Sequence, residues 1–366
     1  MKVHAKDLEV GCIVNQDIMG RTSLPILTRN TVIQKQHIKA LWAFGISEVS
    51  VEKTKADGSL FRPANLILPN KEKEKTETTS KQVGGSDQFI RTYLKSVQSF
   101  KRQFQQWQSG MSVDIAEMRE VILPLTKMVA EESHLLYYIN EYSSKTEYLY
   151  HHSIAVGIIS AMLGKKLGLD AGNVNQVALA GILADCGMSR ISPLVLKKQT
   201  ALTENEFKEI KMHTAHSYKM IKEASLLKPE AKLAIFQHHE RIDGSGYPTK
   251  EKNERVHLYS QIVAISDVFH AMTSERLYRS KQPIFKVLEM IRRDQFGKFN
   301  FKVVNALLDL FGNLTTGTQV RLSSGQMAEV VFTKSNYQTR PLVRVLPSEE
   351  IIDLSTQTEL YISAIM

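Results

Sequence analysis

The sequence predicts a mainly α-helical chain with a small α+β module at its N-terminal end and a β-rich extension at its C-terminal end. Apolar residues recur at helical spacing through the middle of the chain, whereas short alternating runs bounded by turn residues are concentrated near both ends. The chain has 366 residues, of which 43% are hydrophobic and 23% charged, so it is long enough for two or three ordinary domains.

Residues 1–66 are predicted to form the α+β module. Residues 11–14 and 46–51 are β-type runs, and residues 36–44 between them have a helical pattern. Residues 67–88 carry charges of mixed sign, a double glycine and no aromatic residue, which is typical of a flexible linker.

Residues 89–145 are predicted to be connecting helices, because an apolar stripe begins there. Its members are spaced three or four residues apart, so they share one helix face. They are Phe89, Tyr93, Val97, Phe100, Phe104, Trp107 and Met111. Two interpretations stay open, packing onto helices of the same chain and a homodimer contact through residues 89–111. Gly110 ends the helix, and Ser112 is predicted to cap the next one.

Residues 146–312 are predicted to be consecutive helices. The almost wholly apolar segment 178–184 should be buried, and Thr203 with Glu206 three residues later resembles a capped helix start. In residues 313–366 the pattern returns to strands. A glycine turn between alternating arms predicts a hairpin over 318–332, and residues 343–345 and 360–362 predict two more strands.

Composition restricts the classes of function. Cys12 and Cys186 are far apart and lie in no CxxC pair, which argues against a thiolate zinc site and a disulfide framework. The chain shows no signal-peptide pattern, no apolar run long enough to span a membrane and no aromatic RNA-binding signature. We therefore expect a cytoplasmic protein that binds neither DNA nor RNA. The net charge of +9 permits an anionic partner without identifying it.

The most informative segment is the run from His238 to Pro248. It begins with two adjacent imidazoles, His238 and His239, and continues through a glycine-rich loop formed by Asp243, Gly244, Gly246, Tyr247 and Pro248. Imidazole is the commonest metal-ligating side chain, and glycine and proline fit a tight turn. Further residues of ligand type recur on predicted helices on both sides of the run, namely His152, Asp185, His213 and Asp267. Together they predict a site for a divalent metal such as iron, manganese or zinc.

With these residues in place, the chain resembles the HD-GYP family, a branch of the HD-domain phosphohydrolases. The resemblance covers residues 146–312, and residues 1–66 and the β-rich tail look like modules that many members carry. Besides the run at 238–248, its motifs are His-Ser-Ile-Ala-Val from His152, Gly-Ile-Leu-Ala-Asp-Cys-Gly from Gly181, the segments ending in His213 and Asp267, and Ala-Met-Thr-Ser-Glu-Arg-Leu-Tyr-Arg from Ala271.

The resemblance implies a helical HD-domain bundle and a metal-dependent phosphodiesterase that opens cyclic di-GMP with two or three metals. It implies that Asp185 bridges two metals, with His152 and Asp267 serving one and His213, His238 and His239 the other. Arg276 and Arg279 would hold the phosphates, a role suited to planar guanidinium groups. The loop at 243–248 implies a surface for a signalling-protein partner.

This chain departs from the family pattern at three positions. Ala184 stands where the family has the histidine of its His-Asp pair, Met188 replaces a lysine, and Tyr148 replaces a glutamate that would hold a third metal. We therefore expect one complete metal site and one impaired site. His151, His216 and His270 are the candidates for a replacement ligand.

Three functions follow from this pattern. The first is a weak or inactive phosphodiesterase that serves as a receptor for cyclic di-GMP or a related cyclic dinucleotide, and it is the one the departures favour. The second is a working hydrolase of cyclic di-GMP or another phosphate ester, with altered metal ligation. The third is an interaction scaffold that binds no nucleotide.

Overall fold

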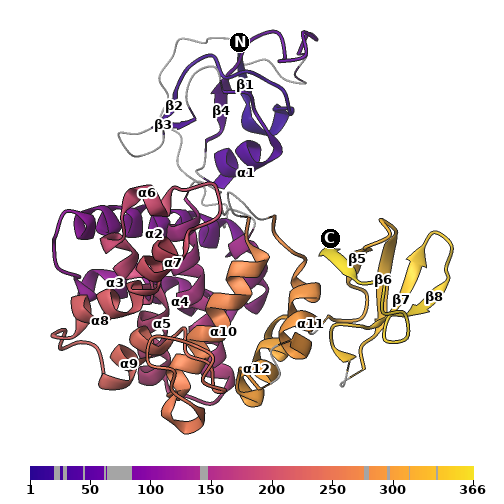
Figure 1. Cartoon of the computed structure of the whole chain (residues 1–366). Helices are drawn as coiled ribbons and strands as arrows, with labels where there is room; N and C mark the ends of the chain where they lie inside the picture. Colours follow the sequence, from indigo (N-terminus) through magenta and orange to yellow (C-terminus); the bar gives the residue numbers. More distant parts are fainter. Residues whose placement is uncertain are drawn as a thin grey trace. The chain divides into compact units, whose positions relative to one another are not determined.

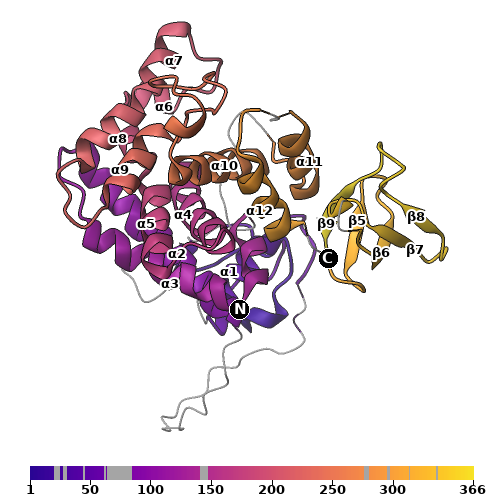
Figure 2. The ribbon, with the colours of Figure 1, turned by 90° about the horizontal axis from the view of Figure 1, so that it is seen from below.

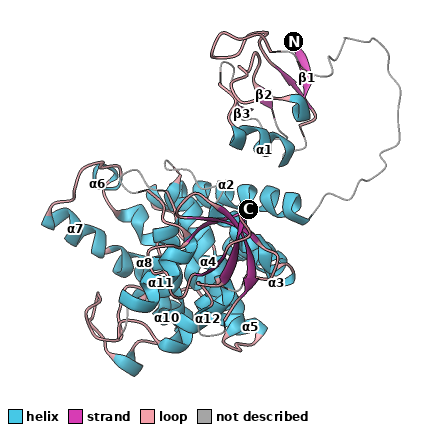
Figure 3. Ribbon diagram, turned by 90° about the vertical axis from the view of Figure 1, so that its right-hand side faces the viewer, coloured by secondary structure: helices cyan, strands magenta, loops and turns pink. Residues whose placement is uncertain are grey.

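A computed structural model describes residues 1–19, 25–27, 31–43, 46–61, 63, 85–140, 147–275, 280–294, 297–312, 314–334 and 337–366. The chain divides into two compact units, Met1–Leu94 and Lys95–Met366, which are described separately (Figure 1). Strands occur in the first unit and at the C-terminal end of the second, and helices make up the rest (Figure 3). The predicted fold class is confirmed. Among the described residues, no helix combines the length and apolar character needed to cross a bilayer.

The first unit is a small α+β module, as predicted. Two antiparallel strand pairs, one turn of 3-10 helix and one α-helix surround a core that includes Cys12, Val14 and Leu41. The elements are β1 Lys2–His4, η1 Ala5–Asp7, β2 Ile18–Met19, β3 Pro25–Leu27, α1 Lys35–Ala43 and β4 Glu48–Ser50. The strand predicted at 11–14 is instead a loop held by isolated bridges from Ile13 and Val14, so its apolar residues fill the core without forming a ladder.

Helix α2, Gly85–Gln108, carries the predicted apolar stripe. The six stripe residues from Phe89 to Trp107 are at most 2% exposed, and only Met111, beyond the helix, is exposed. Phe100 packs edge-on against Trp107, with ring centroids 5.4 Å apart. The stripe is therefore covered within the chain, which favours internal packing over a dimer contact. The predicted linker at 67–88 lies mostly outside the described residues, and its last four residues belong to α2.

Helix α3, Ile115–Glu131, begins at a different cap from the predicted Ser112. The Asp114 side chain accepts hydrogen bonds from the backbone N–H groups of Ala116 and Glu117, at 2.8 and 3.2 Å. The carboxylate also interacts favourably with the positive end of the helix, and Ser112 lies outside the helix.

The helical bundle continues from η2 to α12 (Figure 2). Its elements are η2 Ser133–Asn140, α4 Tyr148–Lys166, α5 Ala171–Leu183, η3 Cys186–Arg190, α6 Pro193–Leu196, α7 Glu204–Lys211, α8 His213–Ile221, α9 Pro229–Gln237, η4 Asn253–Arg255, α10 Leu258–Thr273, α11 Ile284–Asp294 and α12 Phe301–Phe311. Residues 178–184 are buried, and Thr203 and Glu206 form the predicted capping box.

Helices α4 and α5 approach each other closely because glycines face each other across the pair. A Cβ atom on Gly181 would lie 2.8 Å from the Val156 carbonyl oxygen and 2.9 Å from the Gly157 Cα atom. This close approach fixes the C-terminal end of α5 beside α4, and with it the segment that carries Asp185.

The C-terminal extension is a five-stranded antiparallel sheet in the order β8-β7-β6-β5-β9. The strands are β5 Gln319–Leu322, β6 Met327–Phe332, β7 Leu342–Leu346, β8 Ile351–Asp353 and β9 Ile362–Ile365. The predicted β5–β6 hairpin turns at Gly325, whose φ of 88° suits glycine. The strand predicted at 360–362 begins only at Ile362, and β8 was not predicted. Arg340 joins the extension to α11 through an ion pair with Glu289, at 2.7 Å.

Candidate metal centre

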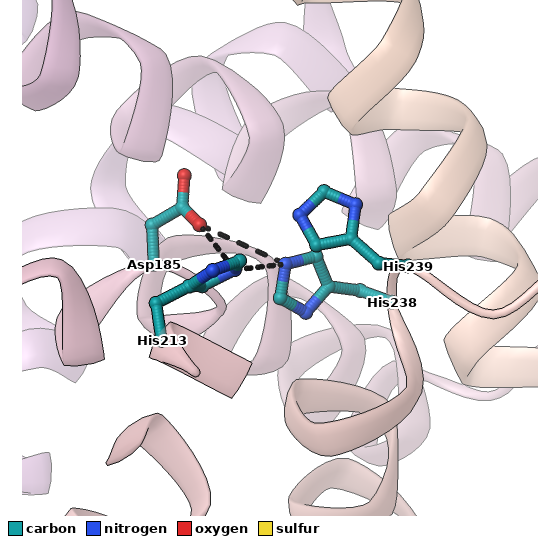
Figure 4. A group of neighbouring side chains, drawn as sticks. All are labelled: Asp185, His213, His238 and His239. Atoms are coloured by element: carbon teal, nitrogen blue, oxygen red, sulfur yellow. Dashed lines mark hydrogen bonds and ion pairs between the residues drawn. The ribbon is translucent and has the colours of Figure 1, made fainter. Parts of the chain in front are cut away.

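The six predicted ligands converge, although they come from separate segments. His152 lies on α4, Asp185 directly precedes η3, His213 begins α8, His238 and His239 follow α9, and Asp267 lies on α10. They form two groups that share Asp185. The four-residue group is Asp185, His213, His238 and His239 (Figure 4), and the three-residue group is His152, Asp185 and Asp267. Within each group the candidate ligand atoms all lie within 4.8 Å of one another.

Two imidazoles of the four-residue group are fixed by the backbone. Nδ1 of His213 lies 2.7 Å from the Ile210 carbonyl oxygen, and Nδ1 of His238 lies 2.8 Å from that of Ile235. A carbonyl only accepts, so each Nδ1 carries the proton and each Nε2 is left with a lone pair. The two Nε2 atoms face each other at 3.2 Å, as Figure 4 shows. This is the outer hydrogen bonding that metal-ligating histidines commonly have.

Asp185 supplies the negative charge. Its Oδ1 atom lies 3.2 Å from Nε2 of His213 and 3.7 Å from Nε2 of His238, and it is buried without a hydrogen-bond donor. Burial opposes ionisation, yet the two histidines hold the pKa of Asp185 well below its usual range. Burial would likewise lower the pKa of His213, but Asp185 raises it. A carboxylate oxygen and two imidazole nitrogens that converge on one space form a donor set that fits a divalent cation.

His239 completes the four-residue group. Its pKa lies well below the ordinary value because of burial and the neighbouring His238, so the ring is neutral and able to act as a ligand. Its ring stacks on Tyr247 with centroids 4.7 Å apart, and its Nδ1 atom lies 3.8 Å from Oδ2 of Asp267.

The three-residue group lies on the other side of Asp185. Nε2 of His152 lies 2.9 Å from Oδ1 of Asp267 and 3.6 Å from Oδ2 of Asp185. Burial would raise the pKa of Asp267, but His152 and His239 lower it. Nδ1 of His152 is 2.9 Å from Nδ1 of His270 and 3.1 Å from the Tyr148 hydroxyl. The outer face of His152 is therefore held by side chains rather than by a backbone carbonyl.

A glycine and a serine hold Asp185 against α8. A Cβ atom on Gly187 would lie 2.2 Å from the His213 carbonyl oxygen, so only glycine allows η3 to approach α8 this closely. The Ser217 hydroxyl donates to the Ala184 carbonyl, at 2.7 Å, and accepts from the Gly187 N–H, also at 2.7 Å. These contacts fix the turn on which Asp185 sits.

The loop after His239 is anchored by a buried carboxylate. Oε1 of Glu240 accepts hydrogen bonds from the N–H groups of Thr249 and Lys250 and from the Thr249 hydroxyl, at 2.6, 2.9 and 2.9 Å. A Cβ atom on Gly246 would lie 2.4 Å from the His239 carbonyl oxygen. The loop therefore folds back onto the two histidines and places Tyr247 against His239.

A cavity of about 870 Å³ opens onto both groups. His152, Asp185, His213, His239 and Asp267 lie on its wall, together with apolar residues of α6 and α7. The volume falls within the roughly 300–1,000 Å³ of small-molecule sites. Two of the three departures, Tyr148 and Met188, also line it. Ala184 is buried beside Asp185.

The three candidate replacement histidines do not join either group within the described part of the chain. His151 is buried, which lowers its pKa to about 4, and His216 is half-buried on α8. His270 contacts Nδ1 of His152, whereas Nε2 of His152 faces Asp185 and Asp267. Arg276 and Arg279 lie outside the described residues.

Sequence reasoning missed Ser217 and Glu240, which position ligands without being ligands. Glu240 had a signal, since it directly follows the paired histidines. The only signal for Ser217 was its position one helical turn after His213. An isolated serine is common on helices, so this signal was too weak to identify it.

Comparison with known proteins agrees with this geometry. A family model described as an HD domain matches residues 137–300. A cyclic di-GMP phosphodiesterase of Pseudomonas aeruginosa is 28% identical over 261 residues, which cover 69% of this chain and 62% of that protein. A cyclic di-GMP phosphodiesterase of Thermotoga maritima is 31% identical over 168 residues, 45% of each chain. A 3'3'-cGAMP-specific phosphodiesterase of Vibrio cholerae is 28% identical over 151 residues, 41% of this chain and 33% of that protein.

The chain spans less than two thirds of the length of these curated relatives. Among solved structures, Bd1817, an HDG"Y"P protein from Bdellovibrio bacteriovorus, matches 85% of this chain and 98% of its own with a TM-score of 0.54. At 13% identity this likeness shows the fold. Residues 137–300 therefore form an HD domain. The HD-domain part of the resemblance is thus confirmed over these residues, and the solved structure shares the fold.

Proposed function

We propose that this chain is a metal-binding HD-GYP protein that binds cyclic di-GMP or a related cyclic dinucleotide and hydrolyses it weakly or not at all, so that it serves as a receptor. The observation that carries the proposal is the pair of ligand groups joined by Asp185 at the wall of one cavity. The relatives named as phosphodiesterases of cyclic dinucleotides support the class of ligand.

We infer a role for each ligand from the donor set. His213, His238 and His239 would hold one metal with Asp185, and His152 and Asp267 would hold a second metal with the same carboxylate. When bound, such ions polarise a phosphoryl oxygen and lower the pKa of water. By resemblance, Arg276 and Arg279 would hold the phosphates.

The departures argue for a receptor rather than an efficient enzyme. Ala184 offers no ligand to the three-residue group, and Met188 places a thioether at the cavity wall where the family carries a cationic side chain. Loss of one group that stabilises charge in a transition state commonly lowers a rate by about 10²–10³-fold. Two such losses on one side of the site would leave binding by the four-residue group and the cavity as the main activity.

A working phosphodiesterase is the second candidate. Its support is the three-residue group itself, which still brings three donors within 4.8 Å of one another despite Ala184. A partner surface at the loop is a further proposal, since Asp243, Ser245 and Thr249 are exposed there while Glu240 holds the loop rigid.

The test combines metal analysis, binding and turnover on one preparation. We expect about one equivalent of iron, manganese or zinc per chain after purification without added metal, and saturable binding of cyclic di-GMP by calorimetry. With added manganese, we expect linear product to form at well below the roughly 1 s⁻¹ of an ordinary enzyme. A turnover of about 1 s⁻¹ or more would contradict the receptor proposal and favour a working phosphodiesterase. A protein that takes up no metal and binds no cyclic dinucleotide would contradict both.

A further inference from the structure

Helix α7 has an apolar face that the bundle does not bury. Its two apolar residues, Phe207 and Ile210, are three residues apart and therefore lie on one face of the helix. None of the eight residues of the helix is buried. Phe207 is 48% exposed, and Leu202, just before the helix, is 39% exposed. Both side chains line the cavity, as does Ile210 one turn along. The helix projects at the end of the bundle beside α6 in Figure 2.

The position of α7 is nevertheless fixed, because its acidic side chains are tied to the preceding segment. Glu206 forms the capping box with Thr203 and pairs with Lys198, at 2.5 Å. Glu209 accepts a hydrogen bond from the Ser192 N–H, at 2.9 Å. The exposed phenyl ring is therefore carried on a helix that is anchored through its polar side.

A cation lies next to this ring. The Lys211 ammonium is 4.6 Å from the ring centroid of Phe207 and 5.3 Å from that of Tyr247. Tyr247 in turn stacks on His239 of the four-residue group. Phe207, Tyr247 and His239 all line the cavity, and the Lys211 ammonium lies close to the first two of these rings.

We propose that Phe207 is the stacking platform for a purine base of a nucleotide whose phosphate lies at the metal ligands. This inference rests on the proposed function and extends it to the base. Every purine presents a flat π-face that stacks on an aromatic side chain, and a neighbouring cation strengthens such a contact.

Three observations favour a base over another occupant. The apolar wall formed by Leu202, Phe207 and Ile210 suits a flat ring rather than a charged group. Gln199 and Thr200 also line the cavity, and their amide and hydroxyl groups can bond the polar edge of a base. At about 870 Å³ the cavity is far larger than one phosphodiester requires, so space remains for a nucleoside.

The experiment measures binding of cyclic di-GMP by calorimetry to the full chain loaded with manganese. Phe207→Ala and Phe207→Leu should both weaken binding by about 5- to 150-fold, the usual effect of losing one base–aromatic stack. Phe207→Trp should bind at least as tightly as the parent. The matched control is Phe301→Ala, because Phe301 is 71% exposed on α12 and does not line the cavity.

Melting curves should be nearly equal for all four variants, since neither phenylalanine is buried. The leucine variant separates loss of an aromatic face from loss of apolar volume. Binding by Phe207→Ala within twofold of the parent would overturn the platform, as would an equal loss in Phe301→Ala.

A second arm keeps this inference separate from the proposed function. If the parent binds no cyclic di-GMP, the proposed function fails, and GMP is then compared with ribose 5-phosphate. The platform predicts that GMP binds more tightly and that Phe207→Ala removes the difference. Equal binding of the two compounds, or binding of neither, would overturn the platform.

Discussion

Restoring an imidazole at position 184 is the sharpest test of the metal centre. Ala184 directly precedes Asp185 and is 3% exposed, and the three-residue group beside it has one ligand fewer than the four-residue group. We expect Ala184→His to raise the metal content from about one to about two ions per chain, because the new side chain supplies the missing donor.

The size of the effect on stability can be estimated. A larger side chain at a buried site costs about 1–3 kcal/mol, so the metal-free variant should be less stable than the parent. Binding of one more ion at a concentration 100-fold above its Kd adds about 2.7 kcal/mol. For a unit of this size that corresponds to a rise of about 5–10 °C in melting temperature. Added manganese should therefore raise the melting temperature more in Ala184→His than in the parent.

The assay is elemental analysis of protein purified without added metal, followed by thermal melting with manganese and with a chelator. Ala184→Leu is the matched control, because leucine fills the same buried space and offers no ligand. We expect the leucine variant to keep the metal content of the parent.

Two results would refute the reasoning. A parent that already holds two ions would mean that the three-residue group was never impaired. A folded Ala184→His variant that still holds one ion would mean that position 184 does not face the three-residue group.

Three further predictions concern the supports of the site and the sheet. Gly187→Ala should destabilise the protein by about 1–3 kcal/mol and lower its metal content, because its Cβ atom would press on the His213 carbonyl. Gly172→Ala is the control in denaturation and metal analysis, because its Cβ atom would come no closer than 3.2 Å to its nearest neighbour, a carboxylate oxygen of Asp170. Glu240→Ala should cost about 1–3 kcal/mol and increase proteolysis of the loop at 243–250, since its three donors lose their acceptor; an unchanged cleavage rate would argue against this anchor. Lys334 and Ser355 lower the pKa of Asp353 to about 2, so Asp353 stabilises the fold above its unfolded pKa of 3.8 and loses that effect as the pH falls towards 2. The melting temperature difference between the parent and Asp353→Asn should therefore be equal at pH 7 and pH 5 and smaller at pH 3, and a difference that grows on acidification would contradict it.

The clustering of the six candidate ligands was predictable from the sequence because their chemistry is rare along a chain. Adjacent histidines followed by a glycine-rich turn are uncommon, and the remaining ligands recur at helix positions around them. In the fold all six side chains belong to two groups whose candidate ligand atoms lie within 4.8 Å of one another, so their convergence was predictable, while their role as ligands stays a prediction. The hairpin at 318–332 was equally predictable because the alternation and the turn glycine are local signals.

Features that depend on tertiary packing were not predictable. The apolar residues at 11–14 fit a strand by composition, but in the fold they fill a core from a loop. The apolar stripe on α2 was compatible with packing inside the chain and with a homodimer contact, and only the fold favours one of these over the other. The contacts of Ser217 join segments about 30 residues apart in the chain, so no local pattern could indicate them.

Because the two ligand groups share the Asp185 carboxylate, two ions bound there would fill their sites in sequence rather than independently. The four-residue group places two imidazole nitrogens within 3.7 Å of Oδ1, so under the proposed function it would hold the first ion, whose charge would offset the repulsion among the donors. Asp185 would then be held in place, with its second oxygen facing His152 and available to a second ion. Occupancy of the weaker site should thus rise only after the stronger one is full, and the protein would pass through a stable half-loaded form whose abundance follows the supply of metal.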